Sequence, residues 1–256
     1  MSKNLLEVSS LVMRFQGITA LDDVSFSLEQ GAITSLIGPN GAGKTTLFNC
    51  VTGMYTPTSG QVSFDGRDIT AAKAHTISRH GIARTFQNLA LFGGLSVLEN
   101  LMVGAYLQGS SGLLQGAFLT PKARAEQKAA EASAYEVLDF LGMRDAAHLK
   151  PSEMSYGRQK QVEFARALMQ KARLVMLDEP MAGMSAEEKS AMSILIERVR
   201  SHFGVTFLIV EHDIPVIMGI SDKIVVLDFG RKIAEGTAHE VQNNPLVIAA
   251  YLGDEH

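Results

Sequence analysis

A glycine-rich stretch, Gly38-Pro39-Asn40-Gly41-Ala42-Gly43-Lys44-Thr45-Thr46, fits the pattern G-x-x-x-x-G-K-[ST] of a phosphate-binding loop. The apolar run Ala32–Ile37 before it is typical of a short buried strand, and the segment from Lys44 to Cys50 is typical of the start of a helix. This succession of strand, loop and helix is the context that the motif requires. The alternative is a glycine-rich strand-to-helix turn that binds nothing, and the complete context disfavours it.

The residue types in this stretch suit a polyphosphate. Glycines lack a Cβ, so the chain can turn closely around the ligand with successive backbone N–H groups pointing inward. The helix that begins near Gly43 adds the positive end of its dipole at the same place. Lys44 is then expected to reach the β- and γ-phosphates, and Thr45 to place its hydroxyl on Mg²⁺.

Two further predicted strands end in residues with catalytic chemistry. Arg173–Leu177 is an apolar run that stops at Asp178 and Glu179, as expected at the carboxyl end of a parallel strand, where α/β sheets bind ligands. Asp178 is expected to hold Mg²⁺ through water and Glu179 to polarise an attacking water; two solvated loop acids are the alternative. Val205–Val210 is another core strand, and His212 after it is either a sensor of the γ-phosphate or a structural histidine.

The segment Met154–Gln159 leads into a helix that we expect to end near Gln170. Ser155 is well placed as the N-cap of this helix, and that role alone would explain the serine. The functional alternative is a second anion site made by Ser155, the Gly157 backbone and the helix dipole. No local path brings this segment to the phosphate loop of its own chain, so such a site would suit a nucleotide held by a partner chain.

The N-terminal part of the chain has the pattern of β-structure. Leu6–Val12 and Leu21–Leu28 show partial alternation, and Val62–Phe64 followed by Asp65-Gly66 predicts a hairpin with a type I′ turn. These pieces suggest an antiparallel β-layer beside the nucleotide core. Phe15 lies in a polar turn between the first two strands, where a core residue and a stacking platform for adenine are both open interpretations.

A helical region follows the next predicted strand. Ile82–Gln87 has the pattern of a strand that ends in the polar residue Gln87. From Leu95 to Gln170 the pattern is helical, and Lys122–Leu141 is the longest candidate helix, with Gly142 placed to end it. Its charged side is expected to be a solvated face.

The C-terminal third alternates between strand and helix signals. Ser185 opens a capping box for a helix that we expect to run to about residue 203. Ile224–Asp228 is one more strand, after which Gly230 turns the chain. A second capping box begins at Thr237, and Asn244-Pro245 starts a last short helix.

The bulk properties narrow the class of protein. The chain has 256 residues, of which 46% are hydrophobic and 20% charged, enough for a substantial buried core. The net charge of −4 gives no basic footprint for nucleic acid. Cys50 is the single cysteine, so an internal disulfide is excluded, and we expect it to be a small buried residue. The apolar runs are far shorter than the ~20 residues of a membrane-spanning helix.

Taken together, these motifs resemble the ATP-binding subunit of an ABC transporter over nearly the whole chain. The family's elements occur in its usual order, namely an aromatic loop at Phe15, Walker A at Gly38–Thr46, the Gln loop at Gln87, the signature at Ser155–Gln159, Walker B at Leu174–Glu179 and the switch His212. The resemblance implies an α/β fold: a P-loop NTPase core with a parallel sheet and flanking helices, an antiparallel β-subdomain and an α-helical subdomain.

The resemblance also implies the cofactors, ATP and Mg²⁺, and the residues that handle them. ATP contacts are implied for Phe15, for each residue from Gly38 to Thr46, and for Ser155, Gly157 and Gln159. Metal contacts are implied for Thr45, Gln87 and Asp178, and catalytic roles for Glu179, His212 and Gln87. A single ABC ATP-binding domain is expected over residues 1–256, with the core in 1–87 and 171–236, the helical subdomain in 88–170 and a helical tail in 237–256.

Finer details resemble the branched-chain amino acid importer subfamily, although importers for amides, urea or aromatic acids look alike. The features that carry this are Phe48–Gly53 with Pro57-Thr58, Ala83–Gln87, the Ser-Tyr-Gly signature and the tail from Asn244 to Gly253. Two departures stand out. Met154, Tyr156 and Arg158 replace residues of the usual L-S-G-G-Q signature, and Ala182–Ser185 replaces the usual S-A-L-D, whose Asp commonly makes a contact between subunits.

The implied activity is ATP hydrolysis that powers solute import, with the chain working as a pair that sandwiches two ATP molecules. The implied partners are a second ATPase subunit, two transmembrane permease subunits and, indirectly, an extracytoplasmic solute-binding protein; no nucleic acid is expected. The implied location is the cytoplasmic face of the cell membrane, held through the permease. The alternatives are a soluble ABC-type ATPase on a non-membrane partner, a nucleotide-gated module without hydrolysis, and a P-loop small-molecule kinase, which would leave Ser155–Gln159 unexplained.

Overall fold

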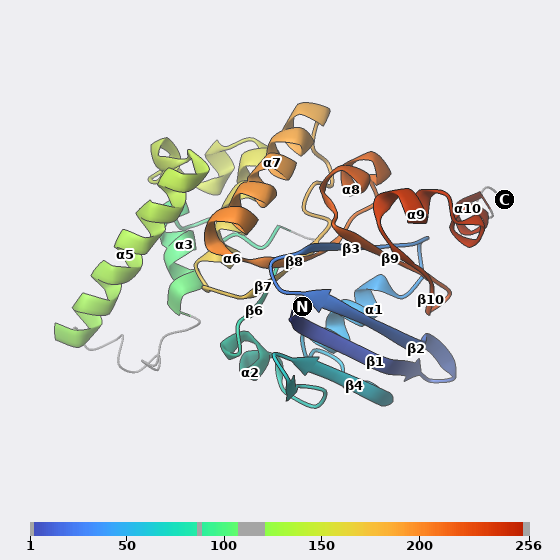
Figure 1. Ribbon diagram of the computed structural model, residues 1–256. Helices are drawn as coiled ribbons and strands as arrows, with labels where there is room; N and C mark the ends of the chain where they lie inside the picture. Colours follow the sequence, from blue (N-terminus) through green and yellow to red (C-terminus); the bar gives the residue numbers. More distant parts are fainter. Residues whose placement is uncertain (1–2, 86–88, 107–120, 253–256) are drawn as a thin grey trace.

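The computed structural model describes residues 3–85, 89–106 and 121–252. Within these residues the strands form two sheets, one of six strands and one of four, with helices packed around them (Figure 1). The α/β class, with a parallel sheet, a separate antiparallel sheet and a helical part, is confirmed. No helix in the described ranges is both long enough and apolar enough to cross a bilayer.

The larger sheet has the strand order β10-β9-β3-β8-β7-β6. Its strands are β3 (Ile33–Ile37), β6 (Ile82–Arg84), β7 (Leu174–Asp178), β8 (Thr206–Val210), β9 (Lys223–Asp228) and β10 (Arg231–Gly236). Neighbouring strands run parallel except for the edge strand β10, which pairs antiparallel with β9. Every residue of β3, β7 and β8 is buried, as expected of central parallel strands covered on both faces.

The smaller sheet is antiparallel, with the order β2-β1-β4-β5. Its strands are β1 (Asn4–Phe15), β2 (Ile18–Glu29), β4 (Ser59–Phe64) and β5 (Arg67–Asp68). Asp65 and Gly66 both have positive φ, 52° and 76°, as the predicted type I′ hairpin turn requires. The predicted antiparallel layer is therefore present, and its first two strands are longer than the alternation suggested.

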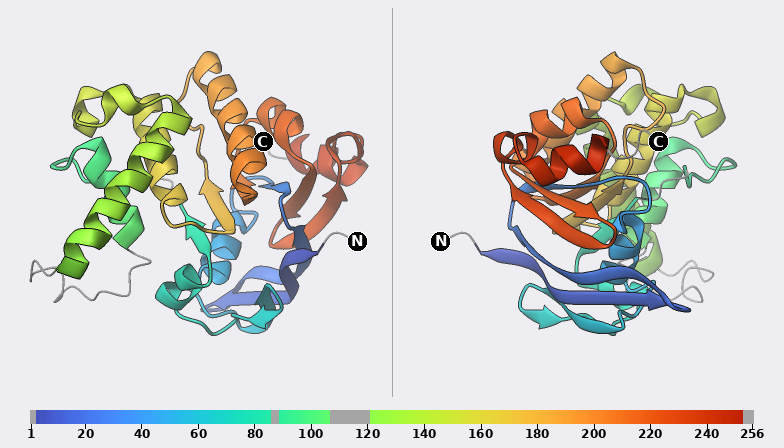
Figure 2. Two further views of the ribbon diagram at one scale, coloured as in Figure 1. Left: turned by 60° about the vertical axis from the view of Figure 1, so that its left-hand side comes forward. Right: turned by 90° about the vertical axis from the view of Figure 1, so that its right-hand side faces the viewer.

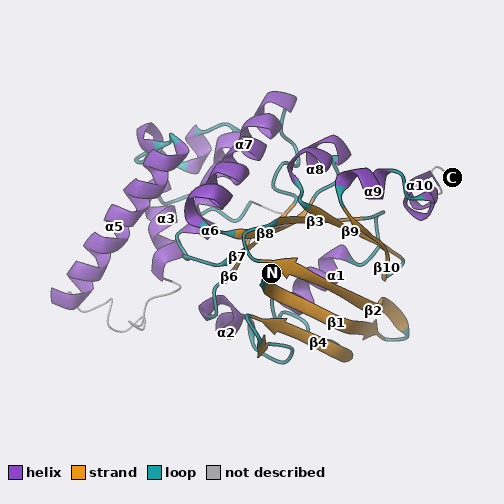
Figure 3. Cartoon of the chain, in the orientation of Figure 1, coloured by secondary structure: helices purple, strands orange, loops and turns teal. Residues whose placement is uncertain are grey.

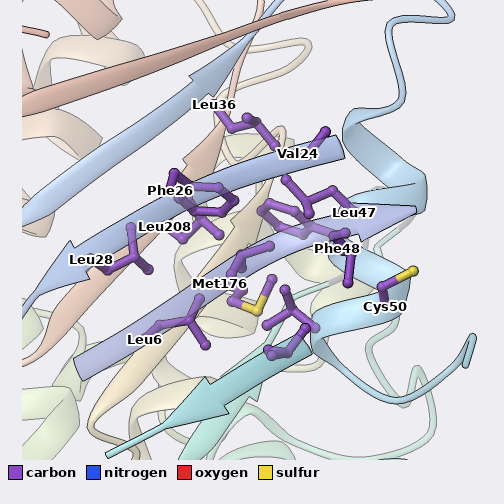
Figure 4. Packing of buried hydrophobic residues seen from close by; sticks show 14 of the residues in the cluster. Leu6, Val24, Phe26, Leu28, Leu36, Leu47, Phe48, Cys50, Met176 and Leu208 are labelled. Atoms are coloured by element: carbon purple, nitrogen blue, oxygen red, sulfur yellow. The ribbon is translucent and has the colours of Figure 1, made fainter. Parts of the chain in front are cut away.

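Helix α1 (Lys44–Val51) lies between the two sheets (Figure 4). Its Leu47, Phe48 and Cys50 belong to one buried cluster with residues of β1, β2 and β4 and with Leu36 and Met176 of the larger sheet. Burial raises the pKa of the Cys50 thiol to about 11, consistent with its expected role as a small core residue. The apolar sides of both sheets therefore fix the helix that follows the glycine-rich loop.

Helices cover the opposite face of the six-stranded sheet (Figure 3). They include α6 (Tyr156–Leu168), α7 (Ala186–Phe203) and α8 (Ile214–Ile220), which share a second buried cluster with that face of the sheet. Side chains alternate along the central strands: Leu36 joins the cluster with α1, whereas Ile33 and Ile37 join this one.

A third buried cluster belongs to the helical part, which extends to one side of the sheets (Figure 2). It joins α3 (Val97–Tyr106), α5 (Pro121–Leu141) and α6. The long predicted helix ends at Gly142 with φ 68°, as expected of a helix-ending glycine. Two short 3-10 turns, Arg144–Ala146 and Pro151–Glu153, lead to the start of α6.

Several short elements escaped sequence analysis. Helix α2 (Ala74–Arg79), helix α8 and edge strand β10 were not predicted, because short or solvent-facing elements have weak periodicity. The predicted strand Ile82–Gln87 ends at Arg84, and Gln87 lies outside the described residues. The predicted capping boxes at Ser185 and Thr237 are both present; Thr237 opens α9 (Ala238–Gln242), and α10 (Pro245–Leu252) follows.

Candidate active site

Three loops meet at the carboxyl ends of β3, β8 and β7, which are neighbours in the sheet. The loop after β3 is the glycine-rich stretch, the loop after β7 carries Glu179, and the loop after β8 carries His212. Together they line a cavity of about 290 Å³ with the residues Ala20, Asn40, Gly41, Ala42, Gly43, Lys44, Thr45, Thr46, Glu179, Val210 and His212. The structure thus brings the predicted phosphate loop and two predicted catalytic residues into one place.

The glycine-rich loop needs glycine at its two ends for steric reasons. A Cβ on Gly38 would lie 2.0 Å from the backbone oxygen of Leu227 in β9. A Cβ on Gly43 would lie 2.7 Å from the backbone oxygen of Ala20, and Gly43 has φ 100°. The hairpin after β9 also holds the loop, because the Gly230 N–H donates to the Ala42 carbonyl. The loop is therefore fitted between β2 and β9, with its inner side facing the cavity.

Helix α1 begins in a way that suits an anion. No side chain caps its N-terminus, and no acidic residue occupies its first turn. The Lys44 ammonium is buried and donates to the carbonyl oxygens of Gly38 and Pro39, at 2.6 and 2.9 Å. Burial lowers the pKa of Lys44, and the charges of Glu179 and Asp178 oppose this shift. A phosphate would supply the negative charge that the first turn of this helix lacks.

Glu179 and His212 face each other across the cavity. Oε1 of Glu179 lies 2.7 Å from Nε2 of His212. Glu179 has φ 49°, in the left-handed region that residues other than glycine seldom adopt, and its N–H donates to the carbonyl of Val210 at the end of β8. Strained backbone of this kind concentrates at functional sites. A carboxylate and an imidazole in contact beside a phosphate loop are suited to moving a proton at an attacking water.

A second acid, Glu211, holds this pair of loops together. It is buried, its Oε1 accepts the Met181 N–H at 2.6 Å and its Oε2 accepts the His212 N–H at 3.1 Å. Burial raises the pKa of Glu211, and the two backbone donors act in the opposite direction. Glu211 was not among the predicted site residues, although it directly follows a buried strand, which is the same kind of signal that pointed to Asp178 and Glu179.

Asp178 is the last residue of β7 and is also buried. Its Oδ2 pairs with Nη2 of Arg84 at 2.7 Å, and its N–H donates to the Thr85 hydroxyl at 3.3 Å. Arg84 also reaches Asn49 of α1, with Nη1 to Oδ1 at 2.6 Å. Arg84 was missed as well, because nothing in a three-residue strand indicates which way its last side chain points.

The other predicted site residues lie elsewhere. Phe15, at the end of β1, is 36% exposed and packs edge-on against Tyr55, with ring centroids 5.2 Å apart. Ser155 is the N-cap of α6, and its hydroxyl accepts the Arg158 N–H at 3.4 Å. The Gln159 amide donates to the Met154 carbonyl at 3.0 Å. Neither Phe15 nor this N-terminal turn of α6 lines the cavity.

The donor set fits magnesium that arrives with a nucleotide. No cluster of three or more metal-binding side chains occurs in the parts of the chain that the structure describes. Mg²⁺ typically takes one or two carboxylates, a hydroxyl and waters in addition to substrate phosphates, and keeps an octahedral shell. The Asp178 carboxylate and the Thr45 hydroxyl are donors of this kind.

Comparison with known protein families agrees with this geometry. A family model for ABC transporters matches residues 21–182, the range from β2 to the loop after β7. The chain belongs to the ABC transporter family. It is an ATPase of this family, and ATP is its nucleotide. A second family model, for branched-chain amino acid ATP-binding cassette transporters, matches residues 231–256.

Individual relatives of this ABC protein match over the full chain. It is 42% identical over 254 residues to the high-affinity branched-chain amino acid transport ATP-binding protein BraF of Pseudomonas aeruginosa, covering 99% of this chain and 100% of BraF. The corresponding protein LivG of Escherichia coli K12 has the same identity and coverage. Among solved structures, the ADP conformation of MJ1267, an ATP-binding cassette of an ABC transporter, superposes with TM-score 0.87 at 33% identity, covering 99% of this chain and 100% of MJ1267.

Proposed function

We propose that this ABC ATPase is the ATP-binding and ATP-hydrolysing subunit of an importer for branched-chain amino acids. The solute class is supported by the names of the full-length relatives BraF and LivG and by the family match over residues 231–256. The observation that carries the hydrolytic part is the contact between Glu179 and His212 beside the glycine-rich loop.

In this proposal each group of site residues has its own role. The loop N–H groups and Lys44 hold the phosphates of ATP, and Lys44 exchanges its contacts with Gly38 and Pro39 for phosphate oxygens. Thr45 and Asp178 would hold Mg²⁺, which would supply positive charge against the phosphates. Glu179 accepts a proton from the attacking water, and His212 orients Glu179 and senses the γ-phosphate. Gln87, in the segment after β6, is assigned a contact with the metal and with the attacking water.

Hydrolysis is proposed to need two chains. Ser155, Gly157 and Gln159 form a helix N-terminus that does not line the cavity of their own chain. A helix N-terminus with small residues is suited to a phosphate, so we assign these residues to the ATP of a second ATPase subunit. Phe15 is assigned to the adenine ring, for which its exposed face is available.

We propose that the helical part of the chain transmits the movement of the two ATPase chains to the membrane subunits. The boundaries expected from the sequence, with residues 88–170 as the helical subdomain, are supported by a separate buried cluster in the described residues of this part. Its partners would be two transmembrane permease subunits at the cytoplasmic face of the cell membrane, which receive solute from an extracytoplasmic binding protein.

The test is purification of the protein from its native membranes, identification of its companion chains, and reconstitution in vesicles. We expect ATP hydrolysis that rises when leucine, isoleucine or valine is supplied with the binding protein. Stimulation by an amide, urea or an aromatic acid instead would overturn the assignment of the solute, whereas the assignment as an importer subunit would still stand. Copurification with soluble partners, with no permease, would overturn the importer itself.

A further inference from the structure

One arginine contacts both Asp178, at the end of β7, and helix α1, which follows the phosphate loop. Arg84 ends β6, the strand beside β7, and its side chain is 9% exposed. Its Nη2 contacts Oδ2 of Asp178 at 2.7 Å, and its Nη1 contacts Oδ1 of Asn49 at 2.6 Å. The guanidinium also lies 5.4 Å from the centre of the Phe48 ring.

These contacts link Asp178 to the helix that follows the phosphate loop. Asn49 and Phe48 lie on α1, whose first residues are Lys44 and Thr45. Thr85, the residue after Arg84, holds the backbone of Asp178, because the Thr85 hydroxyl accepts the Asp178 N–H. Asp178 is therefore held by its carboxylate and by its backbone from the end of β6.

We propose that Arg84 is a positioning residue for magnesium, which fixes the Asp178 carboxylate relative to α1 without touching metal or nucleotide. The inference rests on the proposed role of Asp178 as a metal ligand. A buried carboxylate needs a partner, and the guanidinium contacts Oδ2. The other oxygen, Oδ1, has no hydrogen bond to the described residues and is the atom that we assign to a ligand. Groups that orient a metal ligand from behind commonly change metal affinity or activity by about 10- to 100-fold when removed.

The bridge needs arginine specifically. Its planar guanidinium presents two Nη groups at fixed separation, one to Asn49 and one to Asp178. A lysine at this position would keep the positive charge but is a single point donor, so it cannot reproduce the fixed two-sided geometry. Arg84→Lys therefore keeps the positive charge beside Asp178 but removes the simultaneous contact with Asn49, so its effect measures the positioning of the carboxylate.

The experiment compares nucleotide binding with and without metal. The full-length protein is titrated with a fluorescent, non-hydrolysable ATP analogue, once with an excess of Mg²⁺ and once with EDTA in place of the metal. The ratio of the two affinities measures what the metal adds. We expect Arg84→Lys to reduce this ratio by about 10-fold or more, with binding in EDTA within about twofold of the parent.

Two further variants complete the design. Asn49→Ala leaves the Asp178 contact in place but removes the hydrogen bond from Arg84 to α1, while the contact with Phe48 remains. We therefore expect a smaller reduction of the affinity ratio, about threefold or more, and non-additivity with Arg84→Lys. Arg67→Lys, at an exposed arginine of β5, is the matched control and should leave the ratio unchanged. If Arg84→Lys does not fold, Asn49→Ala decides the question.

The outcomes separate this inference from the proposed function. A parent protein that gains affinity from Mg²⁺, with Arg84→Lys and Asn49→Ala gaining equally, would overturn the role of Arg84 alone. A parent protein whose nucleotide binding does not respond to Mg²⁺ would overturn the assignment of Asp178 to the metal, and with it this inference.

Discussion

Helix α1 and helix α6 both have a small N-cap residue, Gly43 and Ser155, yet they differ in what surrounds their first turns. Helix α1 has no side-chain cap, and its first turn opens into a cavity with Lys44, Glu179 and His212. Helix α6 is capped by the hydroxyl of Ser155, and beside it Tyr156 is 44% exposed. Among the described residues, Lys44, Glu179 and His212 line the cavity at the start of α1, whereas the first turn of α6 does not line that cavity.

The difference suggests that the two helix starts have different roles toward a nucleotide in a pair of chains. A phosphate at α1 would meet the Lys44 ammonium and the residues to which we assign the roles of base and metal ligand. A phosphate at α6 would meet a hydroxyl and backbone N–H groups, which suffice to grip but not to react. The predictions below test whether the two helix starts serve one nucleotide from opposite molecules.

The largest effect is expected at Glu179. Glu179→Gln keeps the shape of the side chain but removes the base, so phosphate release by the assembled transporter should fall by about 100-fold or more. ATP binding should persist, because the loop and Lys44 are unchanged. The control is Glu197→Gln, an exposed acid on α7 that should hydrolyse ATP at the parent rate. Near-normal turnover in Glu179→Gln would remove this residue from the reaction.

A large loss of stability is expected at Gly38. In Gly38→Ala the new Cβ meets the backbone oxygen of Leu227 at 2.0 Å, so β9 or the loop has to move. We expect the free energy of unfolding to fall by roughly 3 kcal/mol or more, with loss of nucleotide binding.

The matched control for this change is Gly31→Ala. Gly31 also has positive φ, 78°, but a Cβ there meets nothing within 4 Å. Its substitution should lower the free energy of unfolding by about 1 kcal/mol, from backbone conformation alone. Equal losses for the two variants in denaturant unfolding would show that the contact with β9 does not shape the phosphate loop.

Two N-cap hydroxyls offer a direct comparison of structure with function. Ser155→Ala and Thr237→Ala each remove an N-cap hydroxyl, so both should lower the free energy of unfolding by about 1 kcal/mol. Only Ser155→Ala should also reduce turnover of the assembled transporter, by roughly 10-fold, as expected for one lost hydrogen bond to a charged group. Binding of ATP to the isolated chain should be unchanged in both. Equal turnover in the two variants would contradict the role of Ser155 across the pair.

The sequence predicted the elements whose residues are constrained locally. The loop, the buried strands β7 and β8 and the capped helices carry their signals in adjacent residues, so their positions were predicted closely. The sheet order then brought Glu179 and His212 to the loop, as parallel strand ends require. For Arg84 no such local signal exists, and for Glu211 the sequence shows an acid directly after a buried strand but not what that acid contacts. Their partners, Asn49 and Met181, are distant in the chain, and only packing sets the direction of their side chains.

The smallest effect concerns pH and the buried acid Glu211. Burial raises the pKa of its carboxyl, and the nearby charge of Glu179 raises it further. The unfolded chain releases this proton near the ordinary carboxyl pKa of about 4.3, whereas the folded chain keeps it to higher pH. Between these two pKa values the folded state binds more protons, so the free energy of unfolding falls as pH rises through this window, and the whole loss is present above it.

Glu211→Gln cannot ionise, so it should lack this loss. Denaturant unfolding at a series of pH values from 4 to 7 should show the stability of Glu211→Gln rising relative to the parent as pH rises. In a Glu179→Gln background the same difference should shrink, because the neighbouring negative charge that raises the pKa of Glu211 is gone. A stability difference that stays constant across this range would mean that Glu211 ionises as freely in the folded chain as in the unfolded one, and that burial beside Met181 and His212 does not hold its proton.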